Sequence, residues 1–202
     1  MKRVVEPLAA PINKVGLVLL RDAASDDPFV CLTQVKAKNP DEQHKVDFGL
    51  PKGTRQYLDP DDNQWKDARD FATAQRYRHA LEPLSVTLMN EAEQEAGVPK
   101  QTYAQATVRD LGERLFTSRK SFRSENIQWY VMEASQPMLT AMNPNPPDAI
   151  EVKWLRLSEV RAMEEAGEIN PCYVDVIAEA ALKLRSNQLR PAQFQELRPP
   201  PR

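Results

Sequence analysis

The stretch Asn90-Glu91-Ala92-Glu93-Gln94-Glu95-Ala96-Gly97-Val98 decides the fold of this chain. Upstream of it, Pro83 suits a first helical turn, because the N–H that proline lacks would be unpaired there. Apolar residues then recur at steps of three and four from Leu84 onward, and Gly97 and Pro99 prevent the helix from continuing. The sequence therefore predicts a helix from about Pro83 to Gly97.

Two acidic residues of this helix share one face. Glu91 and Glu95 are four residues apart, with Gln94 beside them. Like charges at this spacing repel each other by roughly 0.2–0.5 kcal/mol. A hard divalent cation reverses the sign of that interaction, because Mg²⁺ is typically held by one or two carboxylates together with phosphate oxygens. The pattern fits both a metal site and the solvated acidic face of a surface helix.

The spacing resembles the Nudix box, G-x5-E-x7-R-E-U-x-E-E-x-G-U, in which U is an apolar residue. Its second half matches five residues of this chain: Glu91, Ala92, Glu95, Gly97 and Val98. Glu82 stands at the isolated Glu of the pattern, with seven residues between it and Asn90. Gly53 matches the opening Gly, and the Leu50-Pro51-Lys52 that precedes it is frequent in this family.

The resemblance implies the Nudix fold, which is an α/β fold. In it a mixed β-sheet lies between helices as an α/β/α sandwich, and the box is a loop–helix–loop that binds Mg²⁺ or Mn²⁺. The resemblance extends over residues 14–184. Residues 1–13 are expected to be an irregular N-terminal segment, and residues 185–202 a Pro-rich C-terminal tail.

The chain departs from the box in three ways. Between Gly53 and Glu82 lie 28 residues where the pattern has five, so residues 54–81 contain an insertion of 28 − 5 = 23 residues. Asn90 stands where the pattern has Arg, whose guanidinium could hold a neighbouring carboxylate by paired hydrogen bonds. Gln94 stands where the pattern has a Glu that is normally a metal ligand. A Gln carbonyl can coordinate a cation but brings no charge.

The resemblance also implies a set of site residues. The metal ion would be held by the side chains of Glu91, Gln94 and Glu95, near the backbone carbonyl of Gly53. Glu91 and Glu95 would be catalytic, and Glu82 would support them.

Further site residues are open. The resemblance implies that Lys52 faces the substrate phosphates, and the alternative is a solvated loop lysine. A Glu from the later part of the chain often completes the metal site or serves as base in this family, and Glu125 and Glu133 are the candidates here. His44 could meet a phosphate or act as a base, although a single loop histidine is more often solvated.

Composition limits the kinds of protein to which this chain can belong. The chain has 202 residues, 41% of them hydrophobic, which suffices for one sizeable domain. The net charge of −2 gives no general attraction to nucleic acid or to an anionic membrane. Cys31 and Cys172 are the two cysteines, so a disulfide framework is excluded, and Cys31 is expected to pack in the sheet. No apolar run reaches the roughly 18 residues of a membrane span, and we expect a cytoplasmic protein.

The remaining elements follow from local patterns. We expect five strands and two later helices: residues 14–21, 29–36, 107–116 with a turn at Gly112, 126–134 and 151–157, then 158–166 and 171–184. Within the insertion, Asp59-Pro60-Asp61-Asp62 predicts a helix start, and a loose apolar stripe predicts a helix that runs to Leu81. Residues 135–149 contain four prolines and are expected to form a loop.

Three functions are compatible with these observations. The first is a metal-dependent pyrophosphohydrolase that uses Mg²⁺ or Mn²⁺ and acts on a small-molecule nucleotide or diphosphate. The second is a Nudix-like module that binds a nucleotide or a partner and hydrolyses poorly, which Asn90 and Gln94 favour. The third is a protein-interaction role through the insertion and the tail. A homodimer is compatible with each of them.

Overall fold

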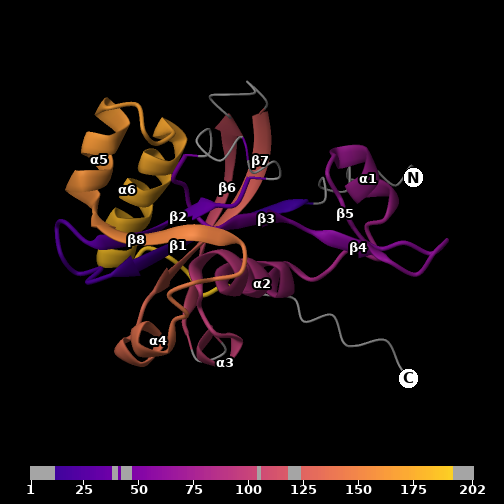
Figure 1. Ribbon diagram of the computed structural model, residues 1–202, viewed down its shortest axis with the longest axis horizontal. Coiled ribbons are helices and arrows are strands. Elements are labelled where there is room, and N and C mark those ends of the chain that lie inside the picture. The colour runs from indigo at the N-terminus through magenta and orange to yellow at the C-terminus, as the bar shows by residue number, and fades with distance from the viewer. Residues whose placement is uncertain (1–11, 38–40, 42–46, 104–105, 118–123, 193–202) are drawn as a thin grey trace, which may run out of the picture.

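A mixed β-sheet forms the centre of the structure, a computed structural model in which residues 12–37, 41, 47–103, 106–117 and 124–192 are described (Figure 1). The sheet comprises six strands: β1 (Lys14–Arg21), β2 (Phe29–Val35), β3 (Lys52–Thr54), β6 (Val108–Thr117), β7 (Ser124–Glu133) and β8 (Ala149–Arg156). Their order is β6-β7-β1-β2-β8, and β3 pairs with β1. The β1–β7 pair is parallel and the other pairs are antiparallel. The mixed sheet and the hairpin between β1 and β2 are thus confirmed.

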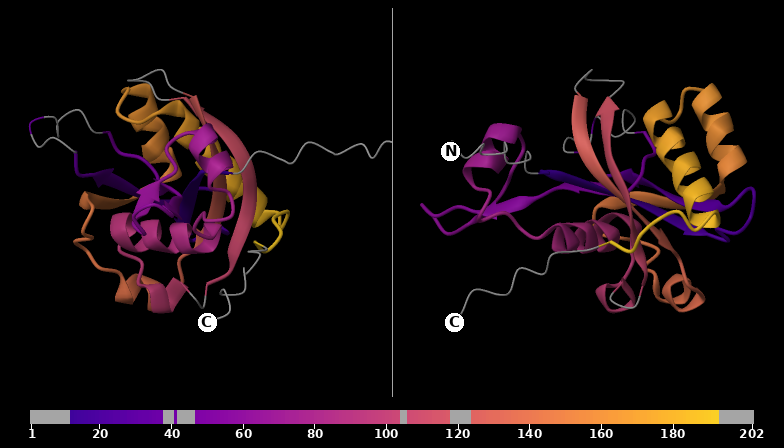
Figure 2. Two further views of the ribbon diagram at one scale, coloured as in Figure 1. Left: turned by 90° about the vertical axis from the view of Figure 1, so that its right-hand side faces the viewer. Right: turned by 180° about the vertical axis from the view of Figure 1, so that it is seen from behind.

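Helices cover both faces of this sheet. One face carries α2 (Leu84–Ala96), α3 (Lys100–Tyr103) and α4 (Gln136–Ala141), and the other carries α5 (Leu157–Glu165) and α6 (Pro171–Arg185) (Figures 1 and 2). Alternate residues of β1 therefore enter different cores. Leu17 and Leu19 pack with the residues around α2, whereas Val18 and Leu20 pack with those around α6. Burial on both faces explains the unbroken apolar run of β1, and the predicted α/β/α sandwich is confirmed.

The predicted box helix is α2. Leu88, Ala92 and Ala96 are fully buried on the face that packs against the sheet. Gly97 ends the helix in the left-handed conformation, with φ of 72°, and its N–H bonds back to the carbonyls of Ala92 and Glu93. A Cβ at Gly97 would also collide with the backbone oxygen of Asn143. Only glycine satisfies both conditions without strain.

The predicted long helix in the insertion is wrong. The segment instead forms a two-stranded hairpin, β4 (Gln56–Leu58) with β5 (Trp65–Asp67), and then the short helix α1 (Phe71–Arg76). The Asp59 carboxylate, which suggested a helix start, accepts the backbone N–H of Asp61 at 3.0 Å and closes a turn. The actual helix start is Asp70, whose carboxylate accepts the N–H of Thr73 at 2.7 Å.

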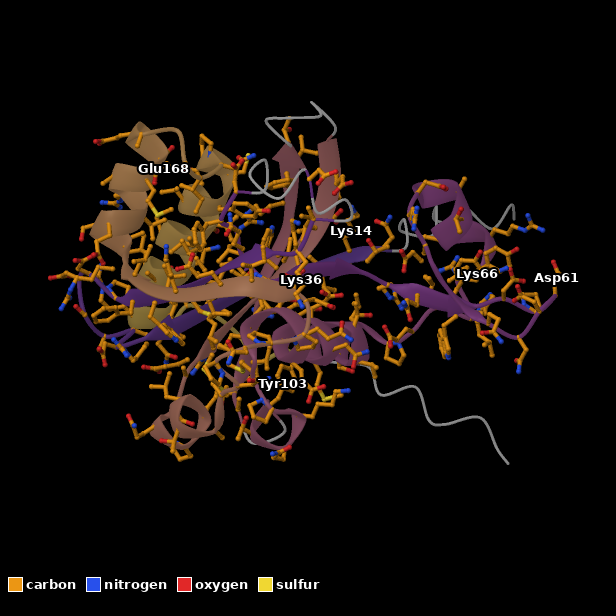
Figure 3. All side chains as sticks on the ribbon, viewed as in Figure 1. Lys14, Lys36, Asp61, Lys66, Tyr103 and Glu168 are labelled. Carbon is orange, nitrogen blue, oxygen red and sulfur yellow. The ribbon has the colours of Figure 1, made fainter. Side chains whose placement is uncertain are left out.

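The hairpin and α1 form an arm that projects from one end of the molecule (Figures 1 and 2). We call residues 56–81 the arm. It has a small core of its own, in which the rings of Tyr57 and Tyr77 stack with centroids 4.1 Å apart. Lys66 bonds to the Asp59 carboxylate at 2.6 Å, and Asp61 lies at the far tip (Figure 3). Because the arm begins soon after Gly53 and ends at Glu82, its base lies beside the box.

Two further expectations need correction. The expected loop 135–149 contains α4, which the Ser135 hydroxyl caps by accepting the N–H of Met138 at 3.4 Å. The expected turn at Gly112 is a bulge inside the continuous strand β6, where φ is 95°. A glycine in a strand marks a bulge as readily as a turn, since both use the positive φ that glycine tolerates. Cys31 is fully buried in the sheet as expected, and burial raises the pKa of its thiol to about 12.

Several expectations fall outside the described residues, among them the loop with His44 and most of both terminal segments. In the described part of the chain, no helix is long and apolar enough to cross a membrane.

Candidate active site

Glu91 of α2 and Gly53 of β3 lie in close contact where the helix packs against the strand. A Cβ built on Gly53 would fall on the carboxylate of Glu91, so any other residue at position 53 would displace that carboxylate. β3 and α2 are adjacent along their lengths. The opening Gly of the box is therefore required by the close approach of the strand to a side chain of the helix.

Glu95 is held against the same strand. Its carboxylate accepts the backbone N–H of Lys52 at 3.0 Å. Glu91 and Glu95 thus lie side by side on α2, as their spacing predicts, and both face the backbone of residues 52 and 53. The carboxylate of Glu91 accepts no hydrogen bond from any residue in the described part of the chain.

Burial makes this carboxylate pair unusually basic. Burial, followed by the charge of Glu95, raises the pKa of Glu91 to about 8. Burial also raises the pKa of Glu95 to about 7, although Lys52 opposes the shift. Two half-buried carboxylates with few donors and a mutual repulsion make up a site that gains strongly from a bound cation. These residues therefore fit the divalent ion that the fold family implies.

Glu82 is fixed by two neutral donors from α2. The hydroxyl of Thr87 donates to one carboxylate oxygen at 2.7 Å, and the amide of Asn90 donates to the other at 3.2 Å. Asn90 therefore contacts Glu82 although it lacks the guanidinium of the box pattern. The contact supports a positioning role for Glu82.

The Lys52 side chain reaches toward the other layer of the sandwich, although its charge also acts on both carboxylates. Its ammonium interacts with Tyr173 on α6 and lies 6.0 Å from the centroid of the Phe116 ring. Tyr173, and then Glu95 and Glu125, raise the pKa of Lys52 against the effect of burial. The backbone N–H of Lys52 thus holds Glu95 of the box, while its side chain joins the two layers of the sandwich.

Gln94 is exposed on α2, and its backbone carbonyl accepts the N–H of Asp148 at 3.0 Å. This bond brings the loop before β8 next to the box. The charge of Asp148 raises the pKa of both Glu91 and Glu95. Asp148 is therefore a third acidic residue near the pair. Sequence reasoning missed it, because a single Asp after prolines carries no signal of what it lies beside.

The two later glutamates lie in different surroundings, and of the two it is the charge of Glu125 that helps to raise the pKa of Lys52. Glu125 forms an ion pair with Lys14 at 2.5 Å. Glu133 lines a separate cavity of about 450 Å³, together with Arg109 and Leu184. Within the described ranges, no group of three or more His, Cys, Asp and Glu side chains is arranged to hold a metal ion. The box alone therefore offers two charged ligands, as expected from the neutral Gln94.

Comparisons with known proteins give matches at the level of structure. No family model matches the sequence, and no curated protein matches it. The NUDIX domain of Shewanella oneidensis NrtR, in complex with ADP ribose, is similar over 87% of this chain and 89% of that one, with a TM-score of 0.52 and 19% identity. A NUDIX hydrolase from Nitrosomonas europaea is similar over 93% and 97% of the two chains, with a TM-score of 0.53 and 12% identity. Together with the sheet order and the box helix, these similarities show that the chain has the Nudix fold.

Proposed function

We propose that this protein is a metal-dependent hydrolase that cleaves the pyrophosphate of a nucleoside diphosphate linked to another group. The observation that carries the proposal is the half-buried pair Glu91 and Glu95, packed against the backbone of β3 with raised pKa values. An acidic pair on a solvated face would show neither the burial nor the close approach of Gly53. The second reading of the sequence pattern, a plain acidic surface, is thereby disfavoured.

In this proposal Glu91 and Glu95 would hold a Mg²⁺ or Mn²⁺ ion near Gly53, and Gln94 would be an uncharged ligand. Mg²⁺ in proteins is usually also bound by substrate phosphates and water. When bound, such an ion polarises a phosphoryl oxygen and lowers the pKa of the attacking water. The two carboxylates would also repel anions that lack a cation, so that the diphosphate would bind together with its cation.

The other residues would fix the position of the carboxylate pair or add charge beside it. Glu82, fixed by Thr87 and Asn90, supports the start of α2 and so the direction in which Glu91 points. Asp148 adds negative charge beside the pair and thereby strengthens its attraction for a cation. The contact of Lys52 with Tyr173 favours a role in joining the layers over direct contact with phosphate.

The second candidate is a nucleotide-binding regulatory module with little turnover. The exposed, neutral Gln94 favours it, because the pattern has a charged ligand at that position. The similar Shewanella domain was solved with ADP ribose bound. In this alternative, the carboxylate pair binds a nucleotide with its cation but the reaction is slow.

The test is hydrolysis of a mixed panel with Mg²⁺ and with Mn²⁺. The panel holds nucleoside triphosphates, dinucleoside polyphosphates, nucleotide sugars and dinucleotides of the NAD type. Glu95→Gln removes one charge of the pair at equal volume. Glu93→Gln is the matched control on the same helix, since Glu93 forms an ion pair with Lys100 at 3.2 Å.

We expect metal-dependent turnover of one substrate class, lost in Glu95→Gln and kept in Glu93→Gln. Absence of turnover with every member of the panel would reject the hydrolase. If nucleotide binding were still detectable by calorimetry, the regulatory module would be the better description.

A further inference from the structure

Arg55 has contacts that neither the box nor the resemblance explains. It lies between β3 and β4, two residues after Gly53. Its Nε donates to the backbone oxygen of Glu82 at 2.7 Å, and its Nη1 donates to the backbone oxygen of Ile12 at 2.8 Å. One guanidinium thus joins the segment before β1 to Glu82, which lies at the base of the arm two residues before α2.

The Arg55 side chain is partly buried, which is costly for a charge. Burial lowers the pKa of Arg55, and the negative charge of Glu82 is the largest effect that opposes this shift. The two charges therefore lie close enough to interact, although the direct hydrogen bonds of Arg55 go to peptide oxygens. A fixed guanidinium with a rigid fork of donors suits such a position better than a flexible ammonium.

The direct partners of the Glu82 carboxylate are neutral. Thr87 and Asn90 each donate one hydrogen bond to it. A nearby positive charge stabilises a carboxylate further than its neutral hydrogen-bond donors do. Among these neighbours Arg55 supplies that charge.

The backbone around Arg55 is fixed on both sides. The Arg55 N–H donates to the oxygen of Asn13 at 2.8 Å, and its carbonyl accepts the N–H of Ala68 at 2.9 Å. The N–H of Glu82 in turn donates to the oxygen of Gln56 at 2.7 Å. These backbone hydrogen bonds therefore fix Arg55 and Glu82 relative to each other at the base of the arm.

We propose that Arg55 is a positioning residue that supplies, from the base of the arm, the positive charge that position 90 of the box lacks. It fixes Glu82, and Glu82 fixes the first turns of α2 and so the direction of Glu91 and Glu95. This inference rests on the proposed function, since the metal site is what the charge would position. It also assigns a role to the start of the insertion.

The experiment moves the guanidinium from one position to the other. Mn²⁺ affinity is measured by calorimetry in wild type, Arg55→Ala, Arg55→Lys and the double variant Arg55→Ala/Asn90→Arg. Arg69→Ala is the matched control, since Arg69 is 71% exposed on the arm and pairs only with Asp67, at 3.4 Å, among its described contacts. Thermal unfolding in EDTA is recorded for each variant, so that loss of fold is separated from loss of the site.

We expect Arg55→Ala to weaken Mn²⁺ binding by about 10- to 100-fold, as is usual for residues that orient metal ligands. Arg55→Lys should recover part of the affinity. The double variant should recover most of the affinity. The side chain at position 90 already contacts Glu82, so an arginine there would bring its guanidinium to the Glu82 carboxylate. Arg69→Ala should bind as wild type does.

Two results would overturn the inference. One is wild-type affinity in a folded Arg55→Ala protein. The other is a loss that Asn90→Arg does not reduce, because a merely structural Arg55 is not replaced by a guanidinium on α2. Failure of the wild type itself to bind Mn²⁺ would reject the proposed function, and the inference with it. Metal binding that is independent of Arg55 would reject only the inference.

Discussion

The amide of Asn90 donates a hydrogen bond to the carboxylate of Glu82 across 3.2 Å, at the position where the Nudix pattern has an arginine. The contact between these two positions is therefore kept while its charge is lost. The same separation applies at Gln94, which has a side-chain oxygen but no charge where the Nudix pattern has a glutamate. Both departures weaken electrostatics and leave geometry intact, which explains how the fold persists with an altered box.

Metal binding should depend steeply on pH, because both carboxylates of the pair must lose their protons. With the pKa of Glu91 at about 8 and that of Glu95 at about 7, the apparent Mn²⁺ affinity should rise from pH 6 to about pH 8.5. Binding at pH 7 should release protons. Calorimetry in two buffers of different ionisation enthalpy measures that release. An affinity that does not change across this range would contradict the raised pKa values.

Stability of the metal-free protein should show the opposite trend. The folded pKa of each acid is raised above its ordinary value of 4.5, so the native state binds more protons than the unfolded state. The stabilising contribution is complete below about pH 4.5 and is lost as the pH rises through 7 and 8. Unfolding scans in EDTA should therefore give a lower Tm at pH 8.5 than at pH 6. Glu91→Gln should flatten that dependence, and an equally steep curve in this variant would assign the trend to other groups.

Gly53→Ala should damage the metal site more than the fold. The new Cβ would occupy the place of the Glu91 carboxylate, so that this side chain must turn away. We expect Mn²⁺ affinity to fall by about 10- to 100-fold, the range seen when ligands lose their orientation. Gly49→Ala is the control, because its Cβ would meet the Tyr173 ring at 3.0 Å instead of a carboxylate. Equal losses of affinity in the two variants would indicate a general packing defect.

Gln94→Glu should raise Mg²⁺ and Mn²⁺ affinity, because it adds a third carboxylate beside Glu91 and Glu95. Gln94 is exposed, so the added charge carries little cost of desolvation. We expect a gain of about tenfold, equivalent to about 1.4 kcal/mol, measured by the same titration. Glu replacement at the exposed Gln101 of α3 is the control. An unchanged affinity in Gln94→Glu would show that position 94 is not a ligand.

The sequence alone determined the elements whose signal is local. The apolar run of residues 14–21 predicted β1 because both faces of a central strand are buried. Apolar residues at steps of three and four, followed by Gly97, predicted α2, because those steps place the residues on one face of a helix. The spacing of Glu91 and Glu95 also fixed their shared face, since a helix converts a four-residue step into proximity.

Tertiary structure decided the remaining features, because they depend on contacts between residues that are distant in the chain. The arm contains a hairpin instead of the expected helix, and its Tyr57 stacks on Tyr77 at the end of α1, a contact that the weak helical stripe did not reveal. Asp148 lies beside the box because its N–H donates to the backbone carbonyl of Gln94, a contact between distant parts of the chain. Arg55 joined Glu82 and Ile12 across gaps of 27 and 43 residues. Such contacts leave no local period in a sequence, because folding, not spacing along the chain, brings the partners together.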